Sequence, residues 1–358
     1  MKIKKILKIS AIIIIVPVLG FAVFLGYAFF ADYKPEAEEV QFTANAPKIL
    51  NDTLEYSALI WNIGYCGLSK DMDFFYDGGT NVYPEESIVN NNLEAVKSFL
   101  SSKNEVDFFL LQEVDKDSKR SWHQNQYEEI TKLFPEYFAF FGKNYDVGFV
   151  PLPVSKPMGK VVSGIMTSSR YEPYSSVRHT FPGSFDFPKN LFMLDRCFLV
   201  NKYKMENGKD LLIINTHNSA FDNGSLKKVE MEFLKTFLLT EYDKGNYIVV
   251  GGDWNQCPPE YEPMFQNFDN VDVSFIDINY LPQEWNWVYS SSLPTNRRVV
   301  KPYNEADTPV TLIDFFLVSP NIEVKSVEGI DLKFENSDHQ PVRMVFKLKN
   351  ETELNVGM

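Results

Sequence analysis

The sequence predicts an α+β sandwich of short strands and a few helices, preceded by one transmembrane helix. Short apolar runs that stop at Gly, Asn, Asp or other polar residues recur along most of the chain, which is typical of strands. Helical spacing occurs in few segments, and these do not alternate with the strands as a doubly wound parallel sheet requires. The 358 residues are 44% hydrophobic and 15% aromatic, which favours a thick core and excludes a disordered chain.

The amino-terminal residues predict a membrane anchor. Four lysines lie within residues 1–8, and an almost uninterrupted apolar run follows over residues 9–30. A helix needs about 20 apolar residues to cross a bilayer, and lysines before it hold that end in the cytoplasm. A cleaved signal peptide is the alternative, but its apolar region is usually about 7–15 residues long and ends in spaced small residues. We therefore expect a retained signal anchor, with the remaining chain outside the cytoplasm.

The rest of the chain is expected to be a linker, one domain and a tail. Residues 31–53 hold two prolines and several glutamates with little apolar periodicity, which is typical of a linker. One folded domain is expected over residues 54–350, followed by a tail at residues 351–358.

The charge of the chain is strongly acidic. The formal net charge is −13, and without the four amino-terminal lysines it is −17. Such a balance gives no general attraction to nucleic acid or to anionic lipid surfaces. A divalent cation in the site, or a small basic patch, remains compatible with it.

The three cysteines, Cys66, Cys197 and Cys257, are widely spaced. They form neither a metal-binding pattern nor a disulfide framework, although a single disulfide would be feasible in an oxidising compartment. None of them has the surroundings of a nucleophile.

The first half of the domain begins with a predicted strand at residues 56–61, an apolar run that ends at an asparagine. Residues 66–83 are polar, aromatic and glycine-bearing, and are expected to form a loop over the site. Residues 85–100 have the apolar spacing of an amphipathic helix, with acids in the first turn. A buried strand at residues 106–111 and a helix at residues 127–134 follow.

The central part is expected to contain two pairs of strands. Residues 137–141 and 161–168 are apolar runs, and the prolines between them predict a loop over residues 144–160. Residues 192–203 and 210–214 form the second pair, and the Asn-Gly sequence that joins them is a hairpin signal.

The last part begins with a predicted helix at residues 225–242 and a strand at residues 247–250. Residues 256–308 are expected to be rich in loops, and residues 310–318 and 342–348 to be strands. The helix is expected to present four apolar residues on one face. These are Leu226, Val229, Phe233 and Phe237.

Polar side chains occur at five strand ends or turns that flank a strand. They are Asn62, Glu113, His217, Asp253 with Asn255, and Asp338 with His339. Each alone is a common turn residue. Their recurrence beside apolar runs predicts one shared site. A carboxylate beside a neutral amide, as in Asp253 and Asn255, suits the hydrolysis of a phosphate ester, because the acid can deprotonate water and the amide can hydrogen-bond an oxyanion.

Six motifs in this order resemble the endonuclease/exonuclease/phosphatase superfamily, which includes deoxyribonucleases, abasic-site endonucleases, inositol-polyphosphate 5-phosphatases and neutral sphingomyelinases. The motifs are Trp61-Asn62, Leu111-Gln112-Glu113, Asn215-Thr216-His217, Gly252-Asp253-Trp254-Asn255, Ile313-Asp314-Phe315-Phe316 and Ser337-Asp338-His339. The resemblance spans about residues 59–346. It implies a four-layer α/β/β/α sandwich of two mixed sheets with helices outside, and a site at one rim.

The resemblance also implies residue roles. Glu113, helped by Asn62, would hold Mg²⁺ or Mn²⁺, with Asp338 as a further ligand. Asp253 would activate the attacking water. Asn255 and His217 would contact the phosphate. His339, oriented by Asp314, would stabilise or protonate the leaving group. Arg196 would contact the phosphate, although an ion pair with Asp195 is an equal alternative, and Arg297 has the same two alternatives.

Three functions are compatible with these residues. A membrane-tethered phosphodiesterase acting as a monomer on a lipid headgroup or a small phosphodiester fits both the anchor and the acidic charge. An anchored DNA or RNA endonuclease should carry a basic groove, which the sequence does not indicate. A non-catalytic binding module would not need the full set of acid, base and ligand residues.

Overall fold

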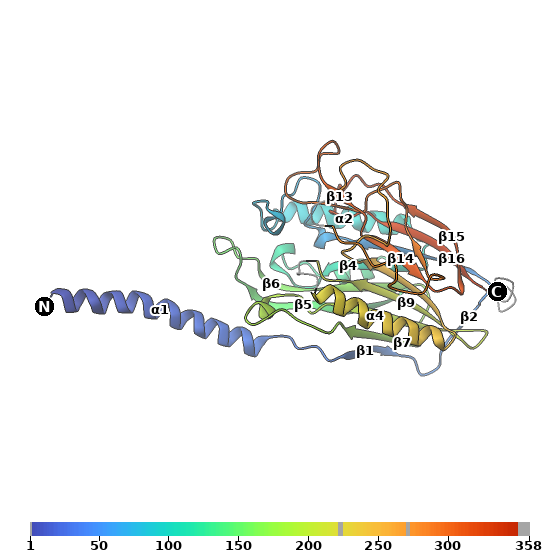
Figure 1. Ribbon diagram of the computed structural model, residues 1–358, viewed down its shortest axis with the longest axis horizontal. Coiled ribbons are helices and arrows are strands. Elements are labelled where there is room, and N and C mark those ends of the chain that lie inside the picture. Colours follow the sequence, from blue (N-terminus) through green and yellow to red (C-terminus); the bar gives the residue numbers. More distant parts are fainter. Residues whose placement is uncertain (1, 221–224, 270–272, 350–358) are drawn as a thin grey trace.

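Two mixed β-sheets pack face to face with helices on their outer sides, as Figure 1 shows. This computed structural model describes residues 2–220, 225–269 and 273–349. The α+β sandwich predicted from the sequence is confirmed. The expected tail at residues 351–358 lies outside the described residues.

The first sheet has eight strands. In spatial order they are β1 (Glu38–Thr43), β7 (Ser175–Thr180), β8 (Cys197–Met205), β9 (Asp210–His217), β10 (Tyr247–Asp253), β14 (Asp314–Val318) and β11 (Asn286–Val288), with β2 (Ile49–Leu50) beside β8. The pairs β9/β10 and β2/β8 are parallel and the other pairs are antiparallel.

The second sheet has six strands. In spatial order they are β15 (Ile322–Gly329), β16 (Val342–Leu348), β3 (Glu55–Asn62), β4 (Phe108–Asp115), β6 (Gly159–Ser169) and β5 (Phe138–Val150). Only β3 and β4 are parallel within it. A separate two-stranded pair joins β12 (Asn296–Arg297) to β13 (Val310–Thr311).

The helices cover the outer faces of the two sheets. They are α2 (Glu86–Ser102), α3 (Gln126–Thr131) and α4 (Ser225–Asp243), with short 3-10 turns at η1 (Gly64–Cys66), η2 (Phe75–Asp77), η3 (Lys119–Ser121) and η4 (Lys189–Phe192). On α2, Val89, Leu93, Val96 and Leu100 recur at helical spacing and pack against the second sheet.

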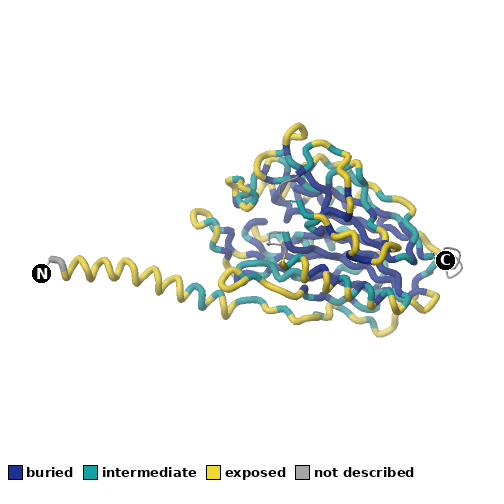
Figure 2. Tube along the Cα trace, viewed as in Figure 1, coloured by how far each residue is buried: buried dark blue, intermediate teal, exposed yellow. Residues whose placement is uncertain are grey.

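The central core lies between the sheets. Ile60, Phe108 and Met344 of the second sheet meet Ile213 and Val249 of the first sheet there, and all five are fully buried. Figure 2 shows these strands as the buried centre of the molecule. The apolar layer holds the strand ends of both sheets in fixed relation, which is what a site built from both sheets requires.

The buried face of α4 differs from the expected one. Leu234 and Leu238 face the core, whereas Val229 is 44% exposed and Phe233 is 38% exposed. Phe233 lies at the border of the buried face and contacts the ring of Phe198. Phe237 packs against the core and contacts the ring of Phe198, so the expected face is partly right. Apolar residues occur on two faces of this helix, and the most buried ones lie on the other face.

Two expected non-regular segments contain strands. Within residues 31–53, β1 pairs with β7 and β2 pairs with β8, so the linker interpretation is wrong for these strands. Most side chains of β1 are exposed or half-buried at the sheet edge, which explains its weak apolar pattern. Likewise β5 continues to Val150, so the loop expected over residues 144–160 is confined to residues 151–158. The strands β7, which lies between β1 and β8, and β15, at the edge of the second sheet, were not expected.

One long apolar helix, α1 (Lys2–Ala31), precedes the sandwich and extends away from it (Figure 1). Among the described residues it is the one helix long and apolar enough to cross a membrane, and the apolar window that meets this test is not buried within the protein. Figure 2 shows its exposed surface. The transmembrane helix expected over residues 9–30 is therefore present as a helix of suitable length.

Candidate active site

Three neighbouring strands of the first sheet bring Asp253, His217 and Asp314 together. The parallel register of β9 and β10 pairs His217 with Asp253, the last residues of their strands. The antiparallel register of β10 and β14 pairs Asp253 with Asp314, the first residue of β14. All three side chains are buried at this edge of the sheet. Strand register alone therefore places an acid between a histidine and a second acid.

The second sheet contributes Asn62 and Glu113. Asn62 ends β3 and pairs with Gln112 of β4, so Glu113 is the next residue along. Glu113 has a positive φ of 54° at a bulge in β4, and a bulge of this kind redirects a side chain out of the strand pattern. Asn62 Nδ2 donates to Asp253 Oδ2 at 3.0 Å and to Glu113 Oε1 at 3.3 Å. The amide thus joins carboxylates from both sheets.

His339 reaches the same acid from the loop before β16. Its Nε2 lies 3.7 Å from Asp253 Oδ2, and its Nδ1 lies 2.8 Å from Asp314 Oδ2. On the other side, His217 Nε2 is 3.4 Å from Asp253 Oδ2. The indole Nε1 of Trp61 donates to the His339 carbonyl oxygen at 3.0 Å and fixes the loop against β3.

The two histidines have opposite electrostatic environments. Burial lowers the pKa of His339, but the carboxylates of Asp314 and Asp253 outweigh it and raise that pKa well above its usual value. Burial, together with the cation of Arg196, holds the pKa of His217 well below its usual value. Burial also raises the pKa of Asp314 to about 6. At neutral pH, His339 is therefore suited to donate a proton and His217 to remain neutral.

Asn255 lies beside Asp253 with its side chain partly committed. Its backbone N–H donates to Asp253 Oδ1 at 2.9 Å, and its Nδ2 donates to the Asn218 carbonyl oxygen at 2.9 Å. Its φ of 50° turns the chain sharply after β10. The backbone N–H of this turn therefore orients the Asp253 carboxylate.

Arg196 is a cation that no carboxylate of the described residues contacts by a hydrogen bond. Its Nη1 is buried and has no hydrogen-bond partner, and no ion pair joins Arg196 to Asp195 in the described part of the chain. Burial lowers its pKa, against the attraction of Glu230 and Glu113. The guanidinium of Arg297 is different, because its Nη2 donates to the Ser69 carbonyl oxygen at 2.7 Å and supports the loops around it.

These groups line a cleft with a volume of about 710 Å³. Arg196, Glu113, His217, Asp253, Asn255, Asp338 and His339 all face it, whereas Asn62 and Asp314 lie behind this layer. The site residues predicted from the sequence therefore converge at one place. Their individual roles remain predictions.

The cleft offers oxygen ligands for a divalent cation. Burial raises the pKa of Asp338 to about 7, and the negative charge of Glu113 contributes to that shift. A cation between these two carboxylates would relieve their repulsion, and carboxylate oxygens are suitable ligands for Mg²⁺ or Mn²⁺. The buried group of Asp253, Asp314 and His339 also places three ligand atoms within 4.8 Å of one another. Asn62 directs its amide nitrogen at the acids, while its Oδ1 accepts from the Gly64 backbone N–H at 3.0 Å.

Asn296 belongs to the site but was not expected there. Its Nδ2 lies 3.0 Å from His339 Nε2, the nitrogen that also faces Asp253. Asn296 lies in β12, a two-residue strand in the region expected to be loops, so no apolar run precedes it. The only sequence signal was its place beside Arg297, which drew attention to the arginine instead.

Comparison with known proteins identifies relatives of the chain. The model of the Endonuclease/Exonuclease/phosphatase family matches residues 59–339. No curated protein sequence matches the chain. The endonuclease/exonuclease/phosphatase from Beutenbergia cavernae DSM 12333 is 17% identical over 83% of this chain and 72% of its own, with a TM-score of 0.59.

Two further solved structures share the fold. The endonuclease/exonuclease/phosphatase from Bacteroides vulgatus is 18% identical over 83% of this chain and 100% of its own, with a TM-score of 0.52. ANGEL2, a 2',3'-cyclic phosphatase in complex with adenosine-2',3'-vanadate, is 15% identical over 89% of this chain and 100% of its own, with a TM-score of 0.53.

Proposed function

Because the chain belongs to the endonuclease/exonuclease/phosphatase family, whose members hydrolyse phosphate esters, we propose that it is a metal-dependent phosphodiesterase tethered to a membrane. Its catalytic domain acts outside the cytoplasm as a monomer, on a lipid headgroup or another small phosphodiester. The single observation that supports this proposal best is the position of Asp253. One of its oxygens faces Asn62, His217 and His339 at 3.0, 3.4 and 3.7 Å.

Asp253 is the general base of the proposed reaction. Its carboxylate takes a proton from the attacking water, and the Asn255 backbone N–H keeps the other oxygen in place. The neutral His217 and the unpaired Nη1 of Arg196 face the same cleft and hydrogen-bond the phosphate oxygens. Asn255 adds a further contact to the phosphate through its amide.

His339 acts on the leaving group. The Asp314 carboxylate accepts from Nδ1, and Nε2–H donates to the departing oxygen once the Asn296 amide nitrogen, now 3.0 Å from Nε2, turns away. The carboxylates around His339 keep it protonated, so the proton is available when the phosphorus–oxygen bond breaks.

Glu113 and Asp338, with Asn62 as a further ligand, would hold Mg²⁺ or Mn²⁺. A bound divalent cation would polarise a phosphoryl oxygen and offset charge on the leaving group. Asn62 would supply its oxygen only after its amide turns over, because its nitrogen now faces the acids.

Two features support a small substrate at a membrane. The apolar helix α1 is long enough to hold the domain at a bilayer. The domain is acidic, and acidic surfaces repel long polyanions while affecting a single phosphodiester much less.

The test is hydrolysis of bis-p-nitrophenyl phosphate by the full-length protein in nanodiscs. Activity should need Mg²⁺ or Mn²⁺ and should disappear with EDTA. Asp253→Asn and His339→Gln should each lower kcat by about 10²- to 10⁴-fold, the usual contribution of general acid–base catalysis. Asp243→Asn and His123→Gln change exposed residues of the same types and should leave kcat unchanged. Wild-type kcat in both site variants, with normal folding by circular dichroism, would refute the mechanism.

A further inference from the structure

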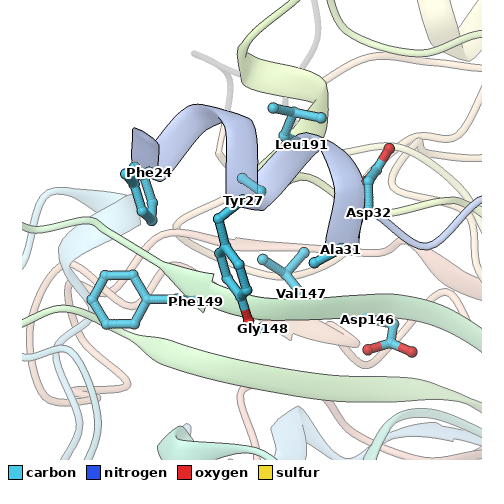
Figure 3. Close-up of a pocket in the computed structure, with 10 residues that line it drawn as sticks. Phe24, Tyr27, Ala31, Asp32, Asp146, Val147, Gly148, Phe149 and Leu191 are labelled. Atoms are coloured by element: carbon cyan, nitrogen blue, oxygen red, sulfur yellow. The ribbon is translucent and has the colours of Figure 1, made fainter. Parts of the chain in front are cut away.

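The last turns of α1 pack against the catalytic domain. The ring of Phe24 stacks on Phe192 with centroids 5.7 Å apart and meets the edge of Phe149 at 6.0 Å. Figure 3 shows Phe24 and Tyr27 directed towards β5, with Val147 and Phe149 opposite them and Leu191 close by. The domain is therefore in direct contact with the helix and is not connected to it by a linker alone.

This contact lies inside the apolar part of the helix. Phe24 comes six residues before Phe30, the end of the apolar run, which is about 9 Å along a helix axis. Whatever contacts Phe24 must lie at a similar depth. If α1 crosses a bilayer as its composition predicts, Phe149 and Phe192 reach the acyl-chain region or its border.

The loops beside this contact expose large apolar side chains. The first is the hairpin tip (residues 149–154) between β5 and β6, where Phe149 is 41%, Leu152 50% and Val154 82% exposed. The second is the segment before η4, where Phe187 is 63% exposed. Figure 1 shows the β5–β6 hairpin projecting at the end of the domain from which α1 leaves. Loop tips in water are usually polar, so exposed apolar clusters of this kind mark contact surfaces.

Charged residues around the apolar tips are mixed in sign. The basic residues near these tips in sequence are Lys34, Lys156 and Lys189, and the acidic ones are Asp32, Asp146 and Asp186. Lys119 adds one further cation, because its Nζ donates to the Pro157 carbonyl oxygen at 3.3 Å. Such a balance gives little net attraction to anionic headgroups. Burial of apolar area, rather than charge, would hold these loops at a membrane, and the contact should therefore resist salt.

The same strands line the catalytic cleft. Tyr145 on β5 and Met158 before β6 face the cleft, and Met193 and Leu194 follow directly after η4 on its wall. Tyr145 is four residues from Phe149, which is about 13 Å along a strand. A membrane that reaches the hairpin tip would therefore lie close to the mouth of the cleft.

We propose that the hairpin tip and Phe187 insert into the leaflet in which α1 ends, so that they form a second membrane contact that holds the cleft against the bilayer surface. The occupant of this apolar surface is lipid, because the surface is continuous with the contact between α1 and the domain. The inference rests on the membrane tether of the proposed function, but it does not depend on the chemistry of the cleft.

Fluorescence quenching in the full-length protein tests this contact. The three native cysteines are buried, so single added cysteines can be labelled with the fluorophore NBD. The labelled variants are Val154→Cys and Phe187→Cys in the proposed contact, Ile13→Cys in α1, and Ser326→Cys on the exposed surface of β15 as the control. Each is reconstituted in nanodiscs with and without lipids that carry a nitroxide on the acyl chain.

Labels at positions 154 and 187 should lose fluorescence to the nitroxide lipids to an extent comparable with position 13, and 0.5 M NaCl should not reverse the loss. Position 326 should be unaffected. The proposal requires quenching at both contact positions, so a response at either one that equals the control would overturn it. The label at position 13 separates the two failures. If it is quenched, only the second contact is wrong, and if it is not, the tether is wrong as well.

Discussion

At the residue scale, Arg196 is a cation whose Nη1 is buried in the cleft and has no hydrogen-bond partner among the described residues. A buried charge without a counter-charge in contact lowers stability. We therefore expect Arg196 to be kept for binding the phosphate. Arg196→Met should lower kcat/KM for bis-p-nitrophenyl phosphate by about 10- to 100-fold, because a hydrogen bond to a charged group contributes about 1.5–3 kcal/mol. The melting temperature should stay the same or rise, since the substitution removes a buried charge that makes no ion pair among the described residues.

Arg170→Met provides the matched control for that prediction. Arg170 is 40% exposed at its side chain and pairs with Asp107, outside the cleft. Its loss should leave kcat/KM unchanged. If Arg196→Met instead lowered the melting temperature and left kcat/KM intact, Arg196 would be a structural cation.

The residues of the site differ in how far the sequence could predict them. Asp253 and His217 directly follow apolar runs, and strand ends at one edge of a sheet meet in space, so their meeting was predictable. Glu113 was expected after a strand but lies within β4, at a bulge that no local pattern indicates. Asn296 could not be predicted, because its position depends on a bridge to His339, 43 residues away.

At the element scale, the end of β10 depends on Gly252. Its φ is 153°, and a Cβ at this position would lie 2.0 Å from the Thr216 carbonyl oxygen on the neighbouring strand. Gly252→Ala would therefore force β9 and β10 apart at the residues that carry His217 and Asp253. The expected cost is on the order of 3 kcal/mol in the free energy of unfolding, from backbone strain and overpacking together. Urea denaturation measures it.

Gly208→Ala separates the clash from the backbone conformation. Gly208 also has a positive φ, 82°, but a Cβ there would meet nothing within 4 Å. The cost of that substitution should be about 1 kcal/mol, the ordinary penalty of alanine in this conformation. Equal costs for the two variants would show that β9 and β10 separate freely at their ends.

The packing of β7 predicts a pH dependence of stability. Burial lowers the pKa of His179 below 6.5, although Glu38 acts against this shift. Below about pH 6.5, His179 binds a proton in the unfolded chain but not in the folded protein. The free energy of unfolding therefore falls as the pH falls. The His179 ring stacks on Phe198 with centroids 4.9 Å apart, and His179→Phe can keep that packing without titrating.

His179→Phe should therefore weaken the loss of stability between pH 7 and pH 5, measured as the free energy of unfolding in urea at each pH. The pH dependence of the two proteins should differ least near pH 8, because the histidine is neutral there in both the folded and the unfolded protein. Parallel pH curves for the two proteins would show that His179 takes up its proton equally in both states.

Elements with a strong apolar pattern were predictable, and those at sheet edges were not. The strand that became β10 and the helix that became α2 each have one dominant buried pattern. The strand β1 lies at an edge and forms largely because it pairs with β7. This pairing leaves no signal in the sequence of β1 itself. The helix α4 has apolar residues on two faces, so the packing of the whole domain decides which face is buried.

At the scale of the whole molecule, the sandwich makes the site a joint product of both sheets. Asn62 of the second sheet donates to Asp253 of the first, and Gln112 Nε2 donates to Asn215 Oδ1 at 2.7 Å behind them. The order of strands in space could not be read from local patterns, because it depends on pairings between residues far apart in the chain. The resemblance of six short motifs implied two mixed sheets with a site at one rim, but not the order of their strands.

The acidic charge of the whole domain separates small substrates from nucleic acid. Without the four amino-terminal lysines the formal charge is −17, so a long polyanion is repelled and added salt screens the repulsion. Cleavage of plasmid DNA, if measurable, should therefore be slow and should accelerate between 20 and 150 mM NaCl. Hydrolysis of bis-p-nitrophenyl phosphate, which carries one charge, should change by less than about twofold over the same range. Rapid DNA cleavage that falls steeply with salt would instead reveal a basic groove that releases counterions, and would make the chain a nuclease.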